Sequence, residues 1–364
     1  MQGMEIEMPQ TAAVVQDVVS EIQTPQAWYG PQQAQLADWR HELTDSDRRE
    51  LRAALDVARQ SGLPLQELGR EQFPLTGLAG RLTRLRRETL EGRGFFLLRG
   101  VPVAEYSPWE SAAAFWGIGL YLGEAVSQNG KGHVLGHVAN LGLDYADPEV
   151  RGYQTSARLN FHTDSSDLVG LLCLQTPQSG GLSSIASSTT VWNEMVRRRP
   201  DLAQALVEPV YYTRWGEIGT GMKPYYGVPV FSACAGHMVT RYVRSSIRKA
   251  QLMPEVPRLT PVQEEALDFF DGLTNDPAIH LSMEFRPGDI QMLCNHWILH
   301  SRTAYVDWPE PEKRRHLLRL WLACEDGPVV PDSFTSSVRG ATRGGRPGGI
   351  EVPGVSLSAP LEPC

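Results

Sequence analysis

From about Val134 onward the chain consists of short apolar runs separated by Gly, Pro, Asn and Asp. Apolar runs of about four to eight residues between turn-forming residues are typical of buried strands, because helices need longer periodic segments. We predict strands at 168–174, 184–186, 207–213, 229–231, 237–242, 279–285, 289–293 and 316–323. So many short strands can bury their apolar faces by packing sheet against sheet or by closing into a barrel. The sequence therefore predicts a mainly β fold, either a sandwich or a barrel.

Helical patterns fill most of the N-terminal third and interrupt the β-rich region twice. Residues 45–62 carry apolar side chains at helical spacing, with Asp45 or Ser46 as the expected N-cap and Gly62 as the terminator. Further helices are predicted at 78–90, 107–120, 188–199 and 261–273, the last with Thr260 as its N-cap, and one more strand at 94–100. We expect a mobile arm over residues 1–26, a single domain over 27–330, and a loop-rich tail over 331–364.

Charge and cysteine content disfavour several classes of protein. The net charge is −8 and no basic tract offsets it, so nucleic acid is not an expected partner. The five cysteines form no CxxC pair, which argues against a disulfide framework and a structural zinc site. The N-terminus has no apolar signal-peptide core, and no apolar run reaches the roughly 18 residues of a transmembrane helix. We expect a cytoplasmic protein with no membrane partner.

Side chains that can bind a metal occur in two separate regions. The first is Asn160-Phe-His162-Thr-Asp164, just before the strand predicted at 168–174. Residues i and i+2 of an extended segment point to the same side, so His162 and Asp164 can reach one metal ion, although a polar loop is the alternative. The second region, 288–302, offers His296 and His300 at even spacing, and the spacing does not distinguish them. Two histidines and one carboxylate on one side of a metal leave its other positions open, as in non-haem Fe(II) oxygenases.

A third region, 313–322, places Arg315 and Arg319 on one face of a predicted strand. Arginines inside an apolar run are costly to bury unless they are paired. An anionic ligand, such as a dicarboxylate co-substrate, is a natural partner for them. A protein carboxylate beside Arg315 is the alternative.

Taken together, these regions resemble the TauD/TfdA-like family of Fe(II)/2-oxoglutarate-dependent dioxygenases. The resemblance runs from about Gly94 to about Cys324 and rests on the fragments FHTDSSDLVGLLCLQ, SGGLSSIASS, PGDIQMLCNHWILHSR and RRHLLRLWL. It implies a double-stranded β-helix, a jelly-roll barrel, with helices packed outside and iron inside near one mouth.

The resemblance assigns the metal ligands. It implies that His162 and Asp164 are the first two iron ligands, and that His300, in the context His300-Ser-Arg302, is the third, with His296 as a supporting residue. Iron halogenases of this broad group carry Ala or Gly in place of the carboxylate. Because Asp164 is present, the resemblance implies oxygenation and not halogenation.

The resemblance also assigns the co-substrate contacts. Arg315 is expected to pair with the distal carboxylate of 2-oxoglutarate, and Arg319 to face the co-substrate or an acidic substrate, with an exchange of the two roles left open. Ser183, which follows the Gly180-Gly181 turn, is expected to contact the co-substrate through its hydroxyl.

The implied reaction consumes O2 and 2-oxoglutarate, hydroxylates an unactivated C–H bond of a small organic molecule, and releases succinate and CO2. Desaturation and ring formation are alternatives within the same chemistry, and Arg319 favours an anionic substrate such as a carboxylate or sulfonate. Gln128, Asn129 and Trp297 are candidates to line the substrate side, and the helical N-terminal third and residues 211–226 are candidates for a lid. A zinc-type hydrolase and a non-catalytic cupin-like binding protein are the alternative functions, and neither accounts for the metal ligands and both arginines. Family members form dimers and tetramers, so a homo-oligomer is one option.

Overall fold

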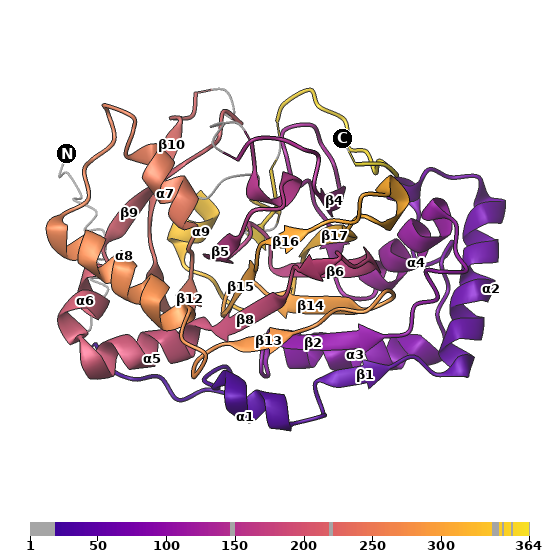
Figure 1. Cartoon of the computed structure of the whole chain (residues 1–364), viewed down its shortest axis with the longest axis horizontal. Helices are drawn as coiled ribbons and strands as arrows, with labels where there is room; N and C mark the ends of the chain where they lie inside the picture. The colour runs from indigo at the N-terminus through magenta and orange to yellow at the C-terminus, as the bar shows by residue number, and fades with distance from the viewer. Residues whose placement is uncertain are drawn as a thin grey trace, which may run out of the picture.

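The computed structural model describes residues 19–145, 150–217, 221–336, 342–343, 346–350 and 352–363. Within these residues the chain is mainly β, with two main sheets and helices packed outside them (Figure 1).

The larger sheet has seven strands. In order across the sheet these are β1 (Arg40–Glu42), β2 (Phe95–Arg99), β14 (Ile290–Cys294), β6 (Leu168–Gln175), β17 (His316–Ala323) and, both beside β17, β4 (Leu135–Ala139) and β3 (Glu124–Ala125). β1 runs parallel to β2, and the other neighbouring pairs are antiparallel. Every residue of β14 is buried, which is why all of its residues except Gln291 are apolar and the strand does not alternate.

The smaller sheet has four antiparallel strands, β13 (Leu281–Met283), β8 (Ser183–Ser187), β15 (Ile298–Arg302) and β5 (Leu159–His162). The register of β15 and β5 places His300 directly opposite His162. Gln291 of β14 donates a hydrogen bond of 3.3 Å to the hydroxyl of Ser183 on β8, so the two sheets touch through side chains.

Short two-stranded ribbons complete the β structure. They pair β9 (Pro209–Thr213) with β10 (Tyr225–Pro229), β11 (Phe231–Cys234) with β12 (His237–Thr240), β7 (Ser179–Gly180) with β16 (Tyr305–Val306), and β18 (Thr342–Arg343) with β19 (Arg346–Pro347). The strand predicted at 229–231 is wrong, because the chain leaves β10 at Pro229 and enters β11 at Phe231 with a different partner. A single apolar run spans this change of partner, so the run alone does not reveal it.

The helices of the N-terminal third cover the larger sheet. They are α2 (Asp45–Ser61), α3 (Gly77–Leu90) and α4 (Pro108–Leu120), with a 3-10 turn at η1 (Leu65–Glu67). The short helix α1 (Gly30–Gln35) contacts β13 of the smaller sheet instead. The N-cap of α2 is Thr44 and not the expected Asp45 or Ser46, because Thr44 and Asp47 exchange hydrogen bonds in a capping box. Gly62 ends the helix as predicted, with φ of 66°. These helices share one apolar core with the larger sheet.

A second group of helices packs around the smaller sheet and the ribbons. It contains α5 (Ser188–Arg198), α6 (Pro200–Ala205), α7 (Arg244–Ala250) and α8 (Pro261–Thr274), with 3-10 turns at η2 (Gly152–Gln154) and η3 (Pro311–Lys313) elsewhere. Thr260 caps α8 as predicted, through a capping box with Gln263. Apolar residues of α5, α6 and α8 form a second core with β9 to β12. Figure 1 shows α2 and α4 at one end of the molecule, and α5, α6 and α8 at the other.

Both terminal segments contact the body of the protein where they are described. Residues 1–18 of the expected arm lie outside the described residues, but residues 19–26 pack on α5. There, Trp192 Nε1 donates to the Ser20 carbonyl (2.9 Å) and the Ile22 N–H donates to Asn193 Oδ1 (2.8 Å). This part of the segment is therefore fixed, in contrast to the expected mobile arm. The described part of the tail contains α9 (Asp332–Ser336), the β18–β19 ribbon and loop. The Val134 N–H donates to the Ser358 carbonyl at 2.9 Å.

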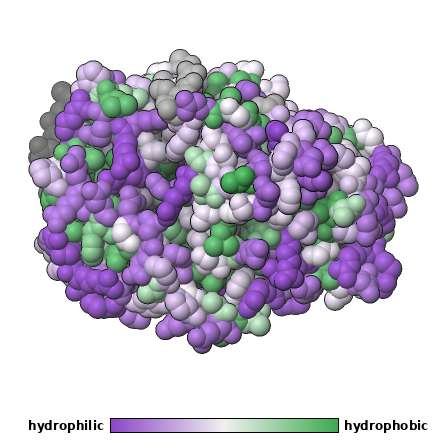
Figure 2. All heavy atoms as spheres, in the orientation of Figure 1, coloured by the Kyte–Doolittle hydropathy of each residue, from purple (hydrophilic) through white to green (hydrophobic). Residues whose placement is uncertain are grey.

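Charged and polar side chains dominate the face drawn in Figure 2, where apolar residues form small separate patches. Among the described residues, no helix has the length and apolar character needed to cross a lipid bilayer. Most large apolar side chains instead lie in the two cores, one under the N-terminal helices and one under α5, α6 and α8. The candidate site lies between the two main sheets.

Candidate metal centre and its cavity

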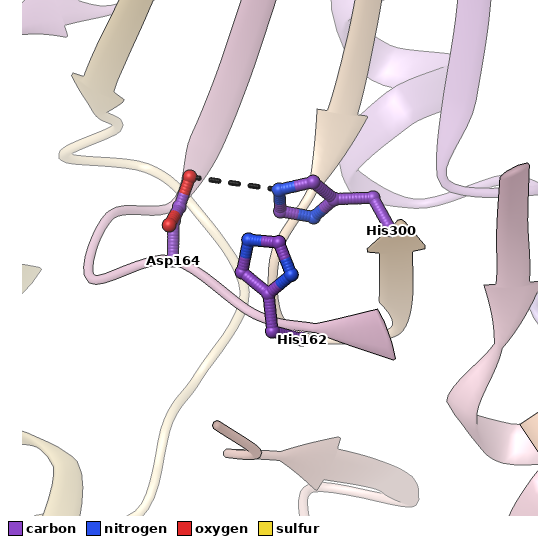
Figure 3. A group of neighbouring side chains, drawn as sticks. All are labelled: His162, Asp164 and His300. Atoms are coloured by element: carbon purple, nitrogen blue, oxygen red, sulfur yellow. Dashed lines mark ion pairs between the residues drawn. The ribbon is translucent and has the colours of Figure 1, made fainter. Parts of the chain in front are cut away.

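Three potential metal ligands from distant parts of the sequence meet at one point (Figure 3). His162 ends β5, Asp164 lies in the loop that follows, and His300 lies on the neighbouring strand β15. One ligand atom from each side chain lies within 4.8 Å of the other two, and the imidazole centroids are 4.2 Å apart. Two imidazole nitrogens and one carboxylate oxygen on one side of a point are the donor set of a facial Fe(II) site.

Local contacts hold His162 in the form that binds a metal. Its Nδ1 lies 2.8 Å from the carbonyl of Asn160, which assigns the proton to Nδ1 and leaves Nε2 as a free lone pair. Burial lowers the pKa of His162 to about 4, so the imidazole is neutral near neutral pH. A neutral ring with a fixed tautomer is what a metal site needs.

The carboxylate of Asp164 is fixed by its neighbours. Oδ2 accepts a hydrogen bond of 2.9 Å from Trp321 Nε1 and lies 3.6 Å from Nε2 of His300. Burial by itself raises the pKa of Asp164, but the close contact with His300 and the positive charge of Arg319 lower it further than burial raises it. The group is therefore an ionised ligand at neutral pH.

The structure distinguishes the two histidines that the spacing leaves equivalent. His296 lies outside the triad, and its Nε2 is 2.7 Å from Oδ1 of the fully buried Asp167. The other oxygen of Asp167 accepts the N–H of Cys324 at 2.7 Å. His296 thus ties the strand of His300 to the loop that carries Asp164, as a structural support.

Arg315 is buried without a carboxylate partner for its side chain among the described residues. Its guanidinium lies 5.0 Å from the ring centroid of Tyr305, and Nη1 has no hydrogen-bond partner. Within the described part of the chain, its carboxylate contact runs from the backbone N–H to Asp307 Oδ1 (2.8 Å). Arg302 lies over the same tyrosine ring at 4.7 Å, and burial together with the charge of Arg315 lowers the pKa of Arg302 to about 10. Two buried guanidiniums beside one ring make a strong site for an anion.

Arg319 lies nearer to the triad. Its Nε donates to Gln128 Oε1 at 2.7 Å, and Nη1 is 3.9 Å from Asp164 Oδ2. The guanidinium also lies against the rings of Tyr153 (4.7 Å) and Trp321 (5.0 Å). Arg315 and Arg319 therefore face different parts of one cavity.

Ser183 lines the same cavity and accepts the hydrogen bond from Gln291. The turn before it needs glycine, because Gly180 and Gly181 have φ of 74° and 69°. A Cβ on Gly181 would lie 2.9 Å from the Pro177 ring and 3.2 Å from Arg315 Nε. The glycine pair thus lets the chain pass close to the arginine.

Three residues expected on the substrate side do not line this cavity. Gln128 lies behind Arg319 and also donates to the Val134 and Arg319 carbonyls. Asn129 stabilises a turn by accepting the N–H groups of Lys131 and His133. Trp297 is 1% exposed and packs in the core. The three side chains are therefore not part of this cavity wall, since residues close in sequence to a site can point into the core, and their role toward substrate stays a prediction.

The cavity has a volume of about 170 Å³ and is lined by both main sheets and by the loops between β4 and β5 and between β9 and β10. Thr213, Trp215 and Tyr226, from the region expected to form a lid, are in its wall. Among the described lining residues none precedes Val138, so the N-terminal third contributes nothing to the wall. α2, α3 and α4 share a core with the larger sheet instead, and a role for the N-terminal third in a lid stays a prediction.

Sequence reasoning missed several residues that support the triad. Asn295 Oδ1 accepts the N–H of Asp164 at 2.9 Å, and Arg241 donates to the Asp164 carbonyl at 2.9 Å. Trp321 had a signal, since strand alternation places it on the same face as Arg315 and Arg319. Asn295 and Arg241 had none, because their contacts depend on long-range packing.

A facial histidine and carboxylate set beside buried arginines defines the class of non-haem iron oxygenases. The sequence profile of the taurine catabolism dioxygenase TauD, TfdA family matches residues 61–321, and the chain belongs to this family.

Characterised relatives and solved structures agree with this assignment. The chain is 32% identical over 327 residues to FR-33289 synthase of Streptomyces rubellomurinus, covering 88% of this chain and 95% of the relative. It is 28% identical over 248 residues to the uridine-5'-phosphate dioxygenase of an Amycolatopsis species, covering 64% and 86%. An asparagine oxygenase in complex with Fe(II), 3-hydroxyasparagine and succinate has the same fold, with a TM-score of 0.62 at 18% identity, over 78% of this chain and 93% of that one.

The protein is therefore an Fe(II)/2-oxoglutarate-dependent dioxygenase that uses O2 and acts on a small molecule, as the sequence predicts. This assignment replaces the hydrolase and the binding-protein alternatives.

Proposed function

We propose that this dioxygenase hydroxylates a small anionic organic molecule, with His162, Asp164 and His300 holding Fe(II) and Arg315 holding 2-oxoglutarate. The observation that carries the anionic substrate is the charge of the cavity wall, whose described residues include six arginines and one carboxylate.

The donor set fits Fe(II). His162 is neutral with Nε2 free, Asp164 is ionised, and both face His300 across less than 5 Å. Bound Fe(II), together with 2-oxoglutarate and O2, supplies the oxidising power for an unactivated C–H bond and yields succinate and CO2. The protein orients the three ligands and keeps the opposite side of the metal open to the cavity.

Arg315 is the better candidate for the distal carboxylate of 2-oxoglutarate. Its guanidinium has no carboxylate partner among the residues that the structure describes, whereas Arg319 is already bonded to Gln128 and close to Asp164. Ser183 lines the same cavity and offers a hydroxyl to the same ligand. Arg302 adds a second positive charge that favours a dianion there.

The remaining charges favour an anionic primary substrate. Arg151 is paired with Glu217, and Arg244 with Asp268 and Asp271. The other four lining arginines, Arg241, Arg302, Arg315 and Arg319, have one carboxylate contact among the described residues, the one between Arg319 and Asp164. Fe(II) and 2-oxoglutarate carry equal and opposite charges, so their binding leaves this excess of positive charge unchanged.

The named relatives support the same substrate class. Uridine-5'-phosphate dioxygenase is named for a phosphate ester, and the family is named for taurine, a sulfonate. Arg319 lies 3.9 Å from the Asp164 carboxylate and is the candidate for contacting the anionic group.

The arrangement of sheets supports a double-stranded β-helix. The ligands and arginines of the cavity come from both sheets, as expected when two sheets of a jelly-roll enclose a site between them. We also propose a single catalytic domain over residues 27–330, with the tail docked on it.

The experiment is a two-stage anaerobic titration followed by substrate screening. Fe(II) and then 2-oxoglutarate are added to the apoprotein, and a weak visible absorption band that requires both additions supports the site. Succinate release is then measured against pairs of compounds that differ by a phosphate, sulfonate or carboxylate group. Faster release with the anionic member of each pair supports the proposal, and equal release with the neutral member contradicts the substrate class.

A further inference from the structure

Arg241 is a buried arginine that donates hydrogen bonds to the segment that carries two of the proposed iron ligands, His162 and Asp164. The residue follows β12 and is 5% exposed. Nη1 donates to the carbonyls of Thr163 (3.2 Å) and Asp164 (2.9 Å), and Nη2 donates to Ser165 Oγ (2.9 Å). No carboxylate forms an ion pair with it among the residues that the structure describes. Its fork thus spans two consecutive peptide carbonyls and the next side chain.

Further contacts hold this loop along its length. The Thr163 N–H donates to the Tyr242 carbonyl at 2.8 Å, and the Tyr242 N–H donates to Thr163 Oγ1 at 3.1 Å. The Asp164 N–H donates to Asn295 Oδ1 at 2.9 Å. Both peptide groups of Asp164 are therefore fixed by side chains, the N–H by an amide oxygen and the carbonyl by a guanidinium.

Arg241 stays charged in this position. Burial lowers the pKa of Arg241, but the neighbouring Tyr226 and Tyr212 hydroxyls and the Asp164 carboxylate raise it more. Nη2 also donates to the Tyr226 hydroxyl at 3.1 Å. Burying a charge whose hydrogen-bond acceptors are all neutral costs free energy. A neutral side-chain donor in place of the guanidinium could bind the same carbonyls if only the fold of the loop mattered.

We propose that Arg241 is a positioning residue for the iron site, which fixes the His162–Asp164 loop so that the Asp164 carboxylate faces the two histidines before metal binds. This inference rests on the proposed metal ligands. Groups that orient metal ligands from behind typically change metal affinity or activity by roughly 10- to 100-fold when they are removed. The effect of Arg241 reaches the metal through the backbone of Asp164, so it should alter the geometry of the site as well as its affinity.

The test compares Arg241→Met and Arg241→Lys with the wild type in the full chain. Arg248→Met is the matched control, because Arg248 is exposed on α7 and the substitution removes the same atoms. Anaerobic titration of the apoprotein with Fe(II) gives affinity, the Fe(II)–2-oxoglutarate absorption band reports ligand geometry, and calorimetry gives Tm.

We expect Arg241→Met to weaken Fe(II) binding by about 10- to 100-fold and to shift the band, and Arg241→Lys to recover part of the affinity. The control should match the wild type. Wild-type affinity and band position in Arg241→Met overturn the inference, and so does a loss of affinity that follows a loss of Tm with no recovery by lysine.

If Arg241→Met fails to fold, Arg241→Lys keeps the test, since an ammonium cannot span both carbonyls. An intermediate affinity with a shifted band then supports the inference, and wild-type values overturn it. Asp164→Ala separates the two levels of argument. Retained Fe(II) binding in that variant contradicts the proposed ligands, whereas lost binding beside an unaffected Arg241→Met contradicts the role of Arg241 alone.

Discussion

Replacing Arg315 with methionine should stabilise the apoprotein and weaken co-substrate binding. The guanidinium is buried with Nη1 unpaired, so in the apoprotein it contributes an uncompensated charge. Exchanging such a charge for an apolar side chain of similar length should stabilise the fold by about 2 kcal/mol. For a chain of 364 residues, this corresponds to a rise in Tm of about 3 °C.

Binding of 2-oxoglutarate should change in the opposite direction. A bidentate contact supplies two charge-assisted hydrogen bonds, each contributing about 1.5 kcal/mol or more. Losing about 3 kcal/mol weakens binding by about 150-fold. Arg302 stays in place beside Tyr305, so some attraction for the anion should persist.

Calorimetry of the apoprotein and anaerobic titration of the Fe(II) protein with 2-oxoglutarate measure the two effects separately. Arg314→Met is the control, since Arg314 is the exposed neighbour on the same segment and both quantities should stay at wild-type values. A lower Tm combined with unchanged 2-oxoglutarate affinity would refute the reasoning and direct attention to Arg319.

Three further substitutions test other parts of the site. Trp321→Phe removes the hydrogen bond to Asp164 Oδ2 and should weaken Fe(II) binding by roughly 10-fold or more in an anaerobic titration, so unchanged affinity would contradict that contact. His316 is half-buried, and partial burial with the nearby charges of His137 and Arg315 lowers its pKa to about 4. The unfolded chain therefore binds a proton more readily, and stability falls as pH decreases from about 6.5 toward 4. His316→Gln should therefore reduce the loss of unfolding free energy between pH 7 and 5 by up to about 2 kcal/mol, which is seen as a smaller drop in Tm over that range. A drop in Tm as steep as that of the wild type would exclude this residue as the cause. Gly181→Ala forces a Cβ at φ of 69° close to Arg315 and should destabilise the protein by about 1–2 kcal/mol and raise the KM for 2-oxoglutarate, whereas a neutral outcome in both assays would show that the turn tolerates a side chain.

Segments whose structure depends on local pattern were predictable from the sequence. The strand predicted at 316–323 coincides with β17, and the helix predicted at 261–273 differs from α8 by one residue. In both segments, the spacing of the apolar residues and the turn or capping residues at the ends indicate the same element. β4 and β5 were not predicted, because short strands at the edge of a site mix polar and apolar residues without a clear period.

The choice between His296 and His300 shows where local pattern ends. Both occupy equivalent positions in the sequence, and what separates them is a partner 129 residues away, Asp167, which holds His296. That contact follows from sheet register, which spacing along one segment does not encode. The residues of the cavity wall could not be predicted for a similar reason. Trp297 follows His296 directly in the sequence but packs into the core.

The proposed metal ligands and the proposed anion-binding arginines are carried by different sheets. His162 and His300 belong to the smaller sheet, which adjoins the core of α5, α6 and α8, whereas Arg319 lies on β17 of the larger sheet and Arg315 immediately precedes that strand. A co-substrate held at one end by the metal and at the other by Arg315 would bridge the two sheets like a strut of fixed length. The affinity for 2-oxoglutarate would then report the spacing of the two sheets. Any remote change that moves one sheet relative to the other would weaken binding without altering a residue that touches the ligand.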